Sequence, residues 1–140
     1  MSAAIDSEVA DEFASIDRGN FEWVADWKVL RPLLSPDRLG LAPTAHVVDI
    51  GCGTSLLPVQ LASMYTKVTG VDREPHCAAS MTAQYGDRAG LEWVTCDITC
   101  TDFGTHLADE SANLVVDKGM LDCALVHRSL HTIRAIRRIR

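Results

Sequence analysis

The sequence predicts an α/β fold in which a parallel sheet carries helices on both faces. Two observations lead to this prediction. Short runs rich in β-branched residues alternate with helical segments of about ten residues, which is the pattern of βαβ units. Each of the four runs ends in small or acidic residues. Because ligands of parallel sheets bind beyond the carboxyl ends of the strands, these four ends predict one site.

The predicted strands and helices follow one another from residue 46 onward. Four segments read as strands: His46–Ile50, Lys67–Asp72, Leu91–Cys96 and Ala112–Asp117. The helix predicted over Leu56–Tyr65 has Pro58 in its first turn, where a missing N–H costs little. Pro75 opens a second helix that runs to Tyr85 and ends at Gly86.

The 140 residues are predicted to form a single domain with three parts. Residues 1–43 form a helical lead, residues 44–125 form the core, and residues 126–140 form a basic amphipathic helix. In the lead, Ile5–Asp17 is predicted as an acidic surface helix, and a second helix places Trp23, Trp27 and Leu30 on one face. The apolar positions of the last helix are Leu130, Ile133, Ile136 and Ile139. The second helix is expected to end in a loop at the residues Pro32, Pro36, Gly40 and Pro43.

Charge and composition exclude several classes of protein. The chain has a net charge of −6, and its last 13 residues contain five arginines and no acid. The rest is therefore strongly acidic, which argues against a nucleic-acid-binding surface. No apolar run is long enough for a membrane span, and the first residues do not resemble a secretory signal. The cysteines lack a CxxC pair, so we expect no metal site and a reducing, cytoplasmic location.

The segment Asp49–Ser55 places two glycines, Gly51 and Gly53, directly after the first strand. Without a Cβ, such a turn lets backbone approach a ligand closely. Leu56 stands where a dinucleotide fingerprint would need its third glycine, and no P-loop lysine follows. Asp49 would also repel a phosphate. A neutral or cationic nucleoside therefore fits better, and the alternative is a tight turn without a ligand.

Two further carboxylates end the next strands. Asp72 lies 21 residues after Gly51, a spacing that suits hydrogen bonds to ribose hydroxyls. Its alternative role is that of an N-cap for the helix that begins at Pro75. Asp97 ends the third strand, where it is suited to accept a hydrogen bond from an adenine amino group, or else to form a turn.

These motifs resemble those of class I S-adenosylmethionine-dependent methyltransferases. The resemblance rests on Val47–Ser55, on Asp72, on Cys96-Asp97 and, most specifically, on the segment Val115–Leu125. That last segment, VVDKGMLDCAL, is similar to the "DKGTLDAL" segment of the group that includes the elongation factor 1A and citrate synthase lysine methyltransferases. Phe21-Glu22-Trp23 and the following Trp27-Lys28-Val29-Leu30 resemble the aromatic helix before the first strand in that group.

The resemblance implies a Rossmann-like sheet in the order 3-2-1-4, S-adenosylmethionine as cofactor and a protein lysine as methyl acceptor. It implies that Gly51, Cys52 and Gly53 pass under the methionine part of the cofactor, with Asp49 facing its amino group. Asp72 would hold the ribose, Arg73 would lie beside the adenine, and Asp97 and Ile98 would flank the adenine edge. Asp117 would lie near the sulfonium and orient the lysine amine, while Lys118 would be structural. Methyl transfer is an in-line displacement, so alignment provides most of the acceleration.

The chain departs from this family in length. A complete class I domain has seven strands, and this sequence supplies four, so we expect an incomplete domain with an open edge at the fourth strand. We also expect the apolar stripe of the last helix to lack its cover. These features predict self-association through the open edge and weak or absent methyltransferase activity. The alternative function is a non-catalytic interaction module, and an NAD-dependent oxidoreductase is disfavoured by Leu56.

Overall fold

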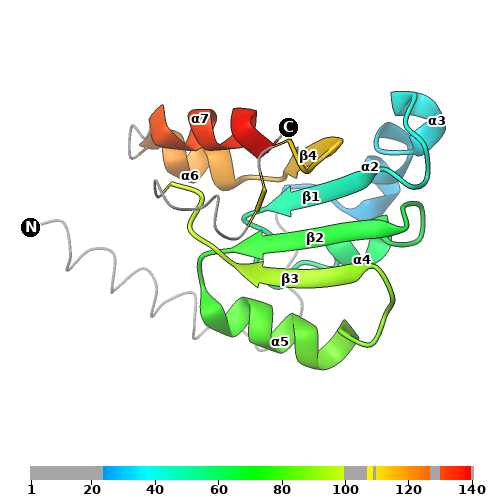
Figure 1. Ribbon diagram of the computed structural model, residues 1–140, viewed down its shortest axis with the longest axis horizontal. Helices are drawn as coiled ribbons and strands as arrows, with labels where there is room; N and C mark the ends of the chain where they lie inside the picture. The colour runs from blue at the N-terminus through cyan, green and yellow to red at the C-terminus, as the bar shows by residue number, and fades with distance from the viewer. Residues whose placement is uncertain (1–23, 100–106, 109, 127–129, 140) are drawn as a thin grey trace, which may run out of the picture.

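The computed structural model describes residues 24–99, 107–108, 110–126 and 130–139. Its centre is a four-stranded sheet in the order β3-β2-β1-β4, with every neighbouring pair parallel (Figure 1). The strands are β1 (His46–Ile50), β2 (Lys67–Asp72), β3 (Leu91–Thr95) and β4 (Leu114–Asp117). The predicted α/β class and the order 3-2-1-4 are therefore confirmed, and the strand boundaries differ from prediction only at Cys96, Ala112 and Asn113.

The sheet is buried on both faces, as expected for parallel strands. All five residues of β1 are buried; Val47 belongs to one apolar cluster, and Val48 and Ile50 belong to the other. One cluster lies on the α7 face and includes Val48, Ile50, Val71, Ile98 and Ile139. The other lies on the α4 face and includes Val47, Leu57, Leu61, Val68 and Val116.

The two crossover helices behave differently. Helix α5 (Pro75–Tyr85) has the predicted bounds, and its C-cap is Gly86. Helix α4 (Leu57–Leu61) is shorter than the predicted Leu56–Tyr65 segment. After Leu61 the chain makes tight turns, in which the Ser63 hydroxyl donates to the Gln60 carbonyl over 2.6 Å. This side-chain bond competes with continued helix, as serine does in a helix interior.

The lead contains helix α2 (Trp27–Leu33) and the single-turn helix α3 (Pro36–Leu39). Asp26 caps α2 by accepting from the amides of Lys28 and Val29, and Ser35 caps α3. The predicted helix end is found at Leu33, but Pro32 lies inside α2, and Pro36 occupies the first turn of α3, where a loop was predicted. That turn tolerates a missing N–H. The predictions for Ile5–Asp17 and Trp23 lie outside the described residues.

After β4 the chain forms α6 (Met120–Val126) and α7 (Leu130–Ile139). The prediction that the apolar stripe of the last helix lacks cover was wrong for the two positions whose side chains the structure describes. Ile139 is fully buried in the cluster on the α7 face, and Ile136 packs against it. The loop before β4 holds the end of α7, because the Glu110 and Ala112 amides donate to the Arg138 and Ile139 carbonyls. Among the described residues, no helix is long and apolar enough to cross a membrane.

Candidate ligand-binding site

The candidate site lies beyond the carboxyl ends of the strands, on the side of the sheet where α6 lies (Figure 1). Its centre is the loop Gly51-Cys52-Gly53, in which Gly51 and Gly53 have φ values of +64° and +52°. Only glycine adopts this left-handed region without strain. The Cys52 amide donates to the Val71 carbonyl over 3.1 Å, and the Ser55 amide donates to the Cys52 carbonyl over 3.0 Å. The loop therefore has a defined shape that continues the pairing of β1 with β2.

The two glycines have different surroundings. A Cβ added at Gly53 would meet no atom within 4 Å, so the space beside its backbone is open. A Cβ added at Gly51 would lie 2.4 Å from Cβ and 2.5 Å from Cγ of Met120, at the start of α6. Gly51 thus permits close packing of α6, whereas Gly53 leaves its backbone accessible to a ligand.

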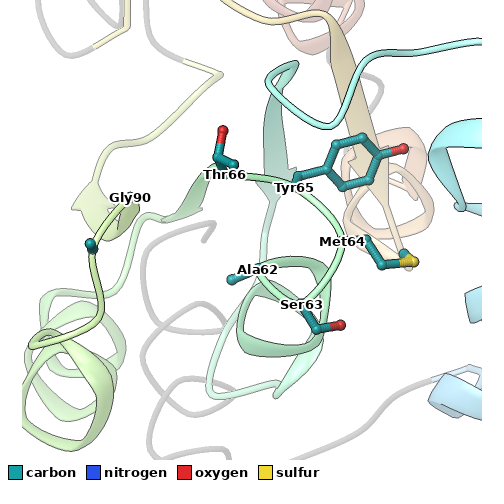
Figure 2. A pocket seen from close by; sticks show the side chains of 7 residues that line it. Ala62, Ser63, Met64, Tyr65, Thr66 and Gly90 are labelled. Atoms are coloured by element: carbon teal, nitrogen blue, oxygen red, sulfur yellow. The ribbon is translucent and has the colours of Figure 1, made fainter.

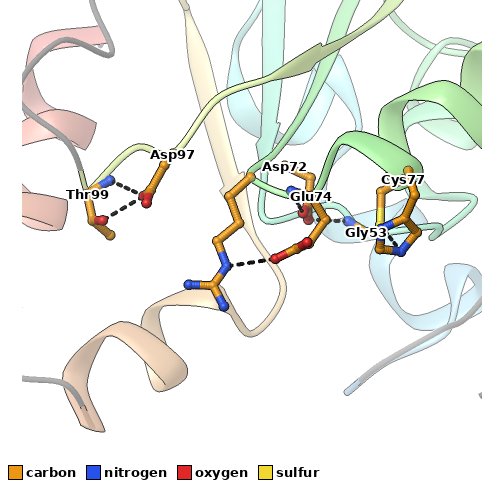
Figure 3. Close-up of polar contacts among 8 residues, drawn as sticks. Gly53, Asp72, Glu74, Cys77, Asp97 and Thr99 are labelled. Atoms are coloured by element: carbon orange, nitrogen blue, oxygen red, sulfur yellow. Dashed lines mark hydrogen bonds and ion pairs between the residues drawn. The ribbon is translucent and has the colours of Figure 1, made fainter. Parts of the chain in front are cut away.

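Asp72, at the end of β2, holds the glycine loop (Figure 3). Its Oδ2 accepts from the Gly53 amide over 2.8 Å, and its Oδ1 accepts from the Glu74 amide over 2.9 Å. The N-cap residue of α5 is Glu74, whose side chain makes no capping bond. The alternative reading of Asp72 as the N-cap was therefore wrong. Its carboxylate lies beside Gly53, where a ribose-binding group was predicted.

The residues predicted around an adenine follow β2 and β3 in the chain, and Figure 3 labels one of them, Asp97. Arg73 is exposed, and its Nε lies 3.3 Å from Oε1 of Glu74. Asp97 forms a turn in which its Oδ1 accepts from both the amide and the hydroxyl of Thr99. The side chain of Ile98 is buried in the cluster on the α7 face.

Asp117, at the end of β4, binds the start of α6. Its Oδ1 accepts from the amides of Gly119 and Met120 over 2.8 and 2.7 Å, and its Oδ2 accepts from the Leu121 amide over 2.8 Å. A helix leaves its first amides without partners, and a carboxylate there also interacts favourably with the helix dipole. Both oxygens of the predicted catalytic carboxylate therefore have a capping role.

Buried acidic and thiol side chains lie in the glycine loop and in the neighbouring elements β1 and α5. Asp49 is only 2% exposed in β1, and Cys52 and Cys77 are also buried. Burial, reinforced by Asp49 and Asp72, raises the pKa of the Cys52 thiol well above its usual value. Burial, reinforced by Asp72 and Glu74, raises the pKa of Cys77 to about 12. Both thiols are therefore protonated near neutral pH, which leaves them as poor nucleophiles.

We expect Cys52 and Cys77 to resist alkylation in the folded chain at pH 8, because the raised pKa suppresses the thiolate and burial blocks access. The exposed Cys123 serves as an internal control and reacts quickly. Mass spectrometry after timed iodoacetamide treatment, with and without guanidinium, measures each rate. Equal rates for Cys52 and Cys123 without denaturant would contradict the described burial.

A hollow lies at the opposite, amino-terminal ends of β2 and β3 (Figure 2). It has a volume of about 430 Å³ and is lined by Ala62, Ser63, Met64, Tyr65, Thr66, Ala89 and Gly90. No charged side chain lines it, so it lacks groups that would recognise an ionic ligand. Among the described residues, no cluster of three or more His, Cys, Asp or Glu side chains could hold a metal ion.

Two parts of the site were missed by sequence reasoning. Helix α6 was not predicted, although an aspartate such as Asp117 shortly before an apolar segment is typical of the start of a helix. The role of Ser55 was also missed, and its Oγ accepts from the amide of Leu57 and from Nζ of Lys118. The structural role predicted for Lys118 agrees with this contact.

Comparison with solved structures shows similarity to methyltransferases at low sequence identity. A TehB-like SAM-dependent methyltransferase from Corynebacterium glutamicum has a TM-score of 0.59 at 17% identity, covering 97% of this chain and 67% of that one. A putative type II methyltransferase from Anaeromyxobacter dehalogenans has a TM-score of 0.57 at 18% identity, covering 85% and 44%. The trans-methyltransferase CalH, in complex with SAH, has a TM-score of 0.56 at 16% identity, covering 69% and 29%.

The chain thus spans less than half the length of the last two structures. No curated protein sequence matches it. The family model described as "Methyltransferase domain" matches residues 47–139, which contain the sheet except for His46, the glycine loop and α7. By this match, the chain belongs to the methyltransferase domain family.

Proposed function

We propose that this chain is an S-adenosylmethionine-dependent methyltransferase whose methyl acceptor is a protein lysine. The observation that carries the cofactor assignment is the glycine loop with its carboxylate: Gly53 has open space beside its backbone, and Asp72 lies against it. The structural neighbour CalH is a trans-methyltransferase in complex with SAH, which supports the same assignment. The lysine acceptor rests on the resemblance of Val115–Leu125 to the lysine methyltransferase group.

The residues at the strand ends fit a cationic nucleoside. We propose that Gly51, Cys52 and Gly53 lie under the methionine part of the cofactor and that Asp72 accepts hydrogen bonds from the ribose. Asp49 is proposed to act on the amino group through the loop. Arg73, Asp97 and Ile98 are proposed to flank the adenine. When bound, the cofactor supplies an electrophilic methyl group on a sulfonium.

The charge at this edge of the sheet favours a cationic acceptor. Asp72 and Asp117 end β2 and β4, and Asp97 lies two residues after the end of β3. Asp122 lies exposed in the first turn of α6. Such an edge attracts an ammonium group and repels a phosphodiester backbone. A protein amine therefore suits this surface better than a nucleic acid.

The proposed chemistry requires a neutral amine in line with the methyl group and sulfur. Asp117 is the carboxylate proposed to orient that amine. Because its oxygens accept three amides of α6, its contribution includes fixing the helix start beside Gly51. We propose Asp117 as a residue that positions both the acceptor and α6.

A second candidate function is a non-catalytic interaction module. One observation favours it: β3 and β4 are the outer strands of the described sheet, and an open strand edge can pair with another chain. As predicted from the sequence, we also propose that the chain self-associates through β4 and that it is located in the cytoplasm. The two functions differ in turnover and not in fold.

A transfer assay separates these functions. The chain is incubated with methyl-labelled S-adenosylmethionine and a heat-treated cytosolic extract, and the products are divided by protease and nuclease treatment. We expect label in the protease-sensitive fraction, from which acid hydrolysis releases it as ε-N-methyllysine. Label in nuclease-sensitive or small-molecule products would contradict the lysine acceptor. Cofactor binding without any transfer would favour the interaction module.

A further inference from the structure

We propose that the segment after β4 positions the glycine loop, with Lys118 and Met120 as the positioning residues. This inference rests on the proposed cofactor site, which it deepens. It assigns to the segment Lys118–Met120 a role in cofactor affinity, exerted through Ser55 and Gly51. The two side chains act on the loop from the side opposite Asp72.

The first contact joins β4 to the segment that follows the glycines. Nζ of Lys118 donates to Oγ of Ser55 over 3.2 Å, across 63 positions of sequence. Ser55 is only 5% exposed, and its Oγ also accepts from the Leu57 amide over 3.0 Å. A buried hydroxyl that accepts two bonds has a fixed orientation, because losing a partner leaves polar atoms unsatisfied. Lys118 therefore stabilises the turn that leads from the loop into α4.

The second contact is steric. Cβ and Cγ of Met120 occupy the space that a side chain at Gly51 would need, at 2.4 and 2.5 Å from an added Cβ. Met120 is itself fixed from two directions, because its amide donates to Asp117 and its side chain packs against the cluster on the α7 face. Gly51 is thereby held between the end of β1 and the start of α6.

Together with Asp72, these contacts reach every second residue of the segment from Gly51 to Ser55. Met120 lies against Gly51, Asp72 accepts from Gly53, and Lys118 donates to Ser55. The three contacting residues come from β2 and from the segment after β4, the strands on either side of β1. A loop held in this way is ordered before a ligand arrives, so binding does not have to order it. Loosening one contact should therefore weaken cofactor binding more than it weakens the fold.

A double-mutant cycle tests this inference in the full chain. Lys118→Met, Ser55→Ala and the double variant are titrated with S-adenosylhomocysteine by calorimetry, and each is unfolded in urea. We expect each single variant to raise Kd by about 5- to 10-fold. The double variant should lose less affinity than the sum of the two single losses, because both substitutions remove the contact between Lys118 and Ser55. Lys118→Arg, which keeps a cationic donor, should restore Kd to within about twofold of the original.

The matched control is Lys67→Met, which removes an exposed lysine at the far end of β2 and should leave Kd unchanged. An unchanged Kd in Lys118→Met, or fully additive losses in the double variant, would overturn the inference. The inference would also be overturned if the fraction of unfolded Lys118→Met protein alone accounted for its loss of affinity.

A ligand-free measurement separates the failure of this inference from failure of the proposed function. Amide hydrogen exchange in the chain alone should accelerate at Gly53 and Leu57 in Lys118→Met, while exchange in β2 stays unchanged. Unchanged exchange at Leu57 would overturn the contact itself. If the original chain does not bind S-adenosylhomocysteine but exchange accelerates in Lys118→Met, the proposed cofactor is overturned and the loop contact is retained.

Discussion

Replacing Asp72 with alanine is expected to weaken binding of S-adenosylmethionine by about 5- to 150-fold, which corresponds to about 1–3 kcal/mol for a hydrogen-bonded charged group. Two effects contribute. The variant removes the carboxylate proposed to bind the ribose, and it leaves the Gly53 amide without its acceptor. The second effect removes one of the hydrogen bonds that hold the loop with the two left-handed glycines. Calorimetric titration of both proteins measures the difference.

Two further variants act as controls for this prediction. Asp72→Asn keeps one acceptor oxygen and should lose less affinity than Asp72→Ala. Asp87→Ala removes an exposed carboxylate near the end of α5 and should bind as the original chain does. Unchanged affinity in Asp72→Ala, or an equal loss in Asp87→Ala, would contradict a specific role for Asp72.

Replacing Ile139 with alanine is expected to lower the free energy of unfolding by about 2–5 kcal/mol, the usual cost of truncating a buried isoleucine. Ile139 is fully buried beside Val48 and Ile50, so its removal leaves a cavity between α7 and the sheet. This is a large share of a stability that is typically about 5–15 kcal/mol for a domain. Urea denaturation of both proteins gives the difference.

The control for this prediction is on the same helix. Arg134 is exposed, so Arg134→Ala should change the free energy of unfolding by no more than about 0.5 kcal/mol. If Ile139→Ala cost as little as Arg134→Ala, α7 would not pack on the sheet as described.

The strands were predictable because their signal is local. The runs His46–Ile50 and Lys67–Asp72 are rich in β-branched residues and end at glycine or aspartate, and burial on both faces demands such runs. Pro75 and Gly86 mark α5 equally clearly. The parallel order follows once helices separate successive strands, because crossovers are right-handed and short.

The remaining features depend on contacts that residue type and helical spacing do not reveal. The cover of Ile139 comes from Val48, Ile50 and neighbours that lie far away in sequence, so the amphipathic pattern of α7 alone could not show what it packs against. The early end of α4 depends on a turn in which Ser63 binds Gln60, and several residues there have comparable helical spacing. For α7 the helical pattern does not name the surface that covers Ile139, and for α4 it does not show where the helix ends.

The site was predictable in position but not in partners. The carboxyl ends of parallel strands meet at one edge, so Asp72, Asp97 and Asp117 could be assigned to it together. Their acceptor roles toward backbone amides could not be read from residue type, because an aspartate that binds a ligand and one that caps a helix look alike in sequence. The contact between Lys118 and Ser55 similarly requires the pairing of β1 with β4.

The central claim is that S-adenosylmethionine binds at the glycine loop beyond the strand ends. Mapping of backbone amide shifts by nuclear magnetic resonance during titration with S-adenosylhomocysteine tests it most directly. We expect the largest shifts at Gly51, Cys52, Gly53 and the residues following Asp72, with little change at Ala62–Thr66 around the hollow at the amino-terminal strand ends. Shifts concentrated at Ala62–Thr66, or no saturable shift at millimolar ligand, would contradict it.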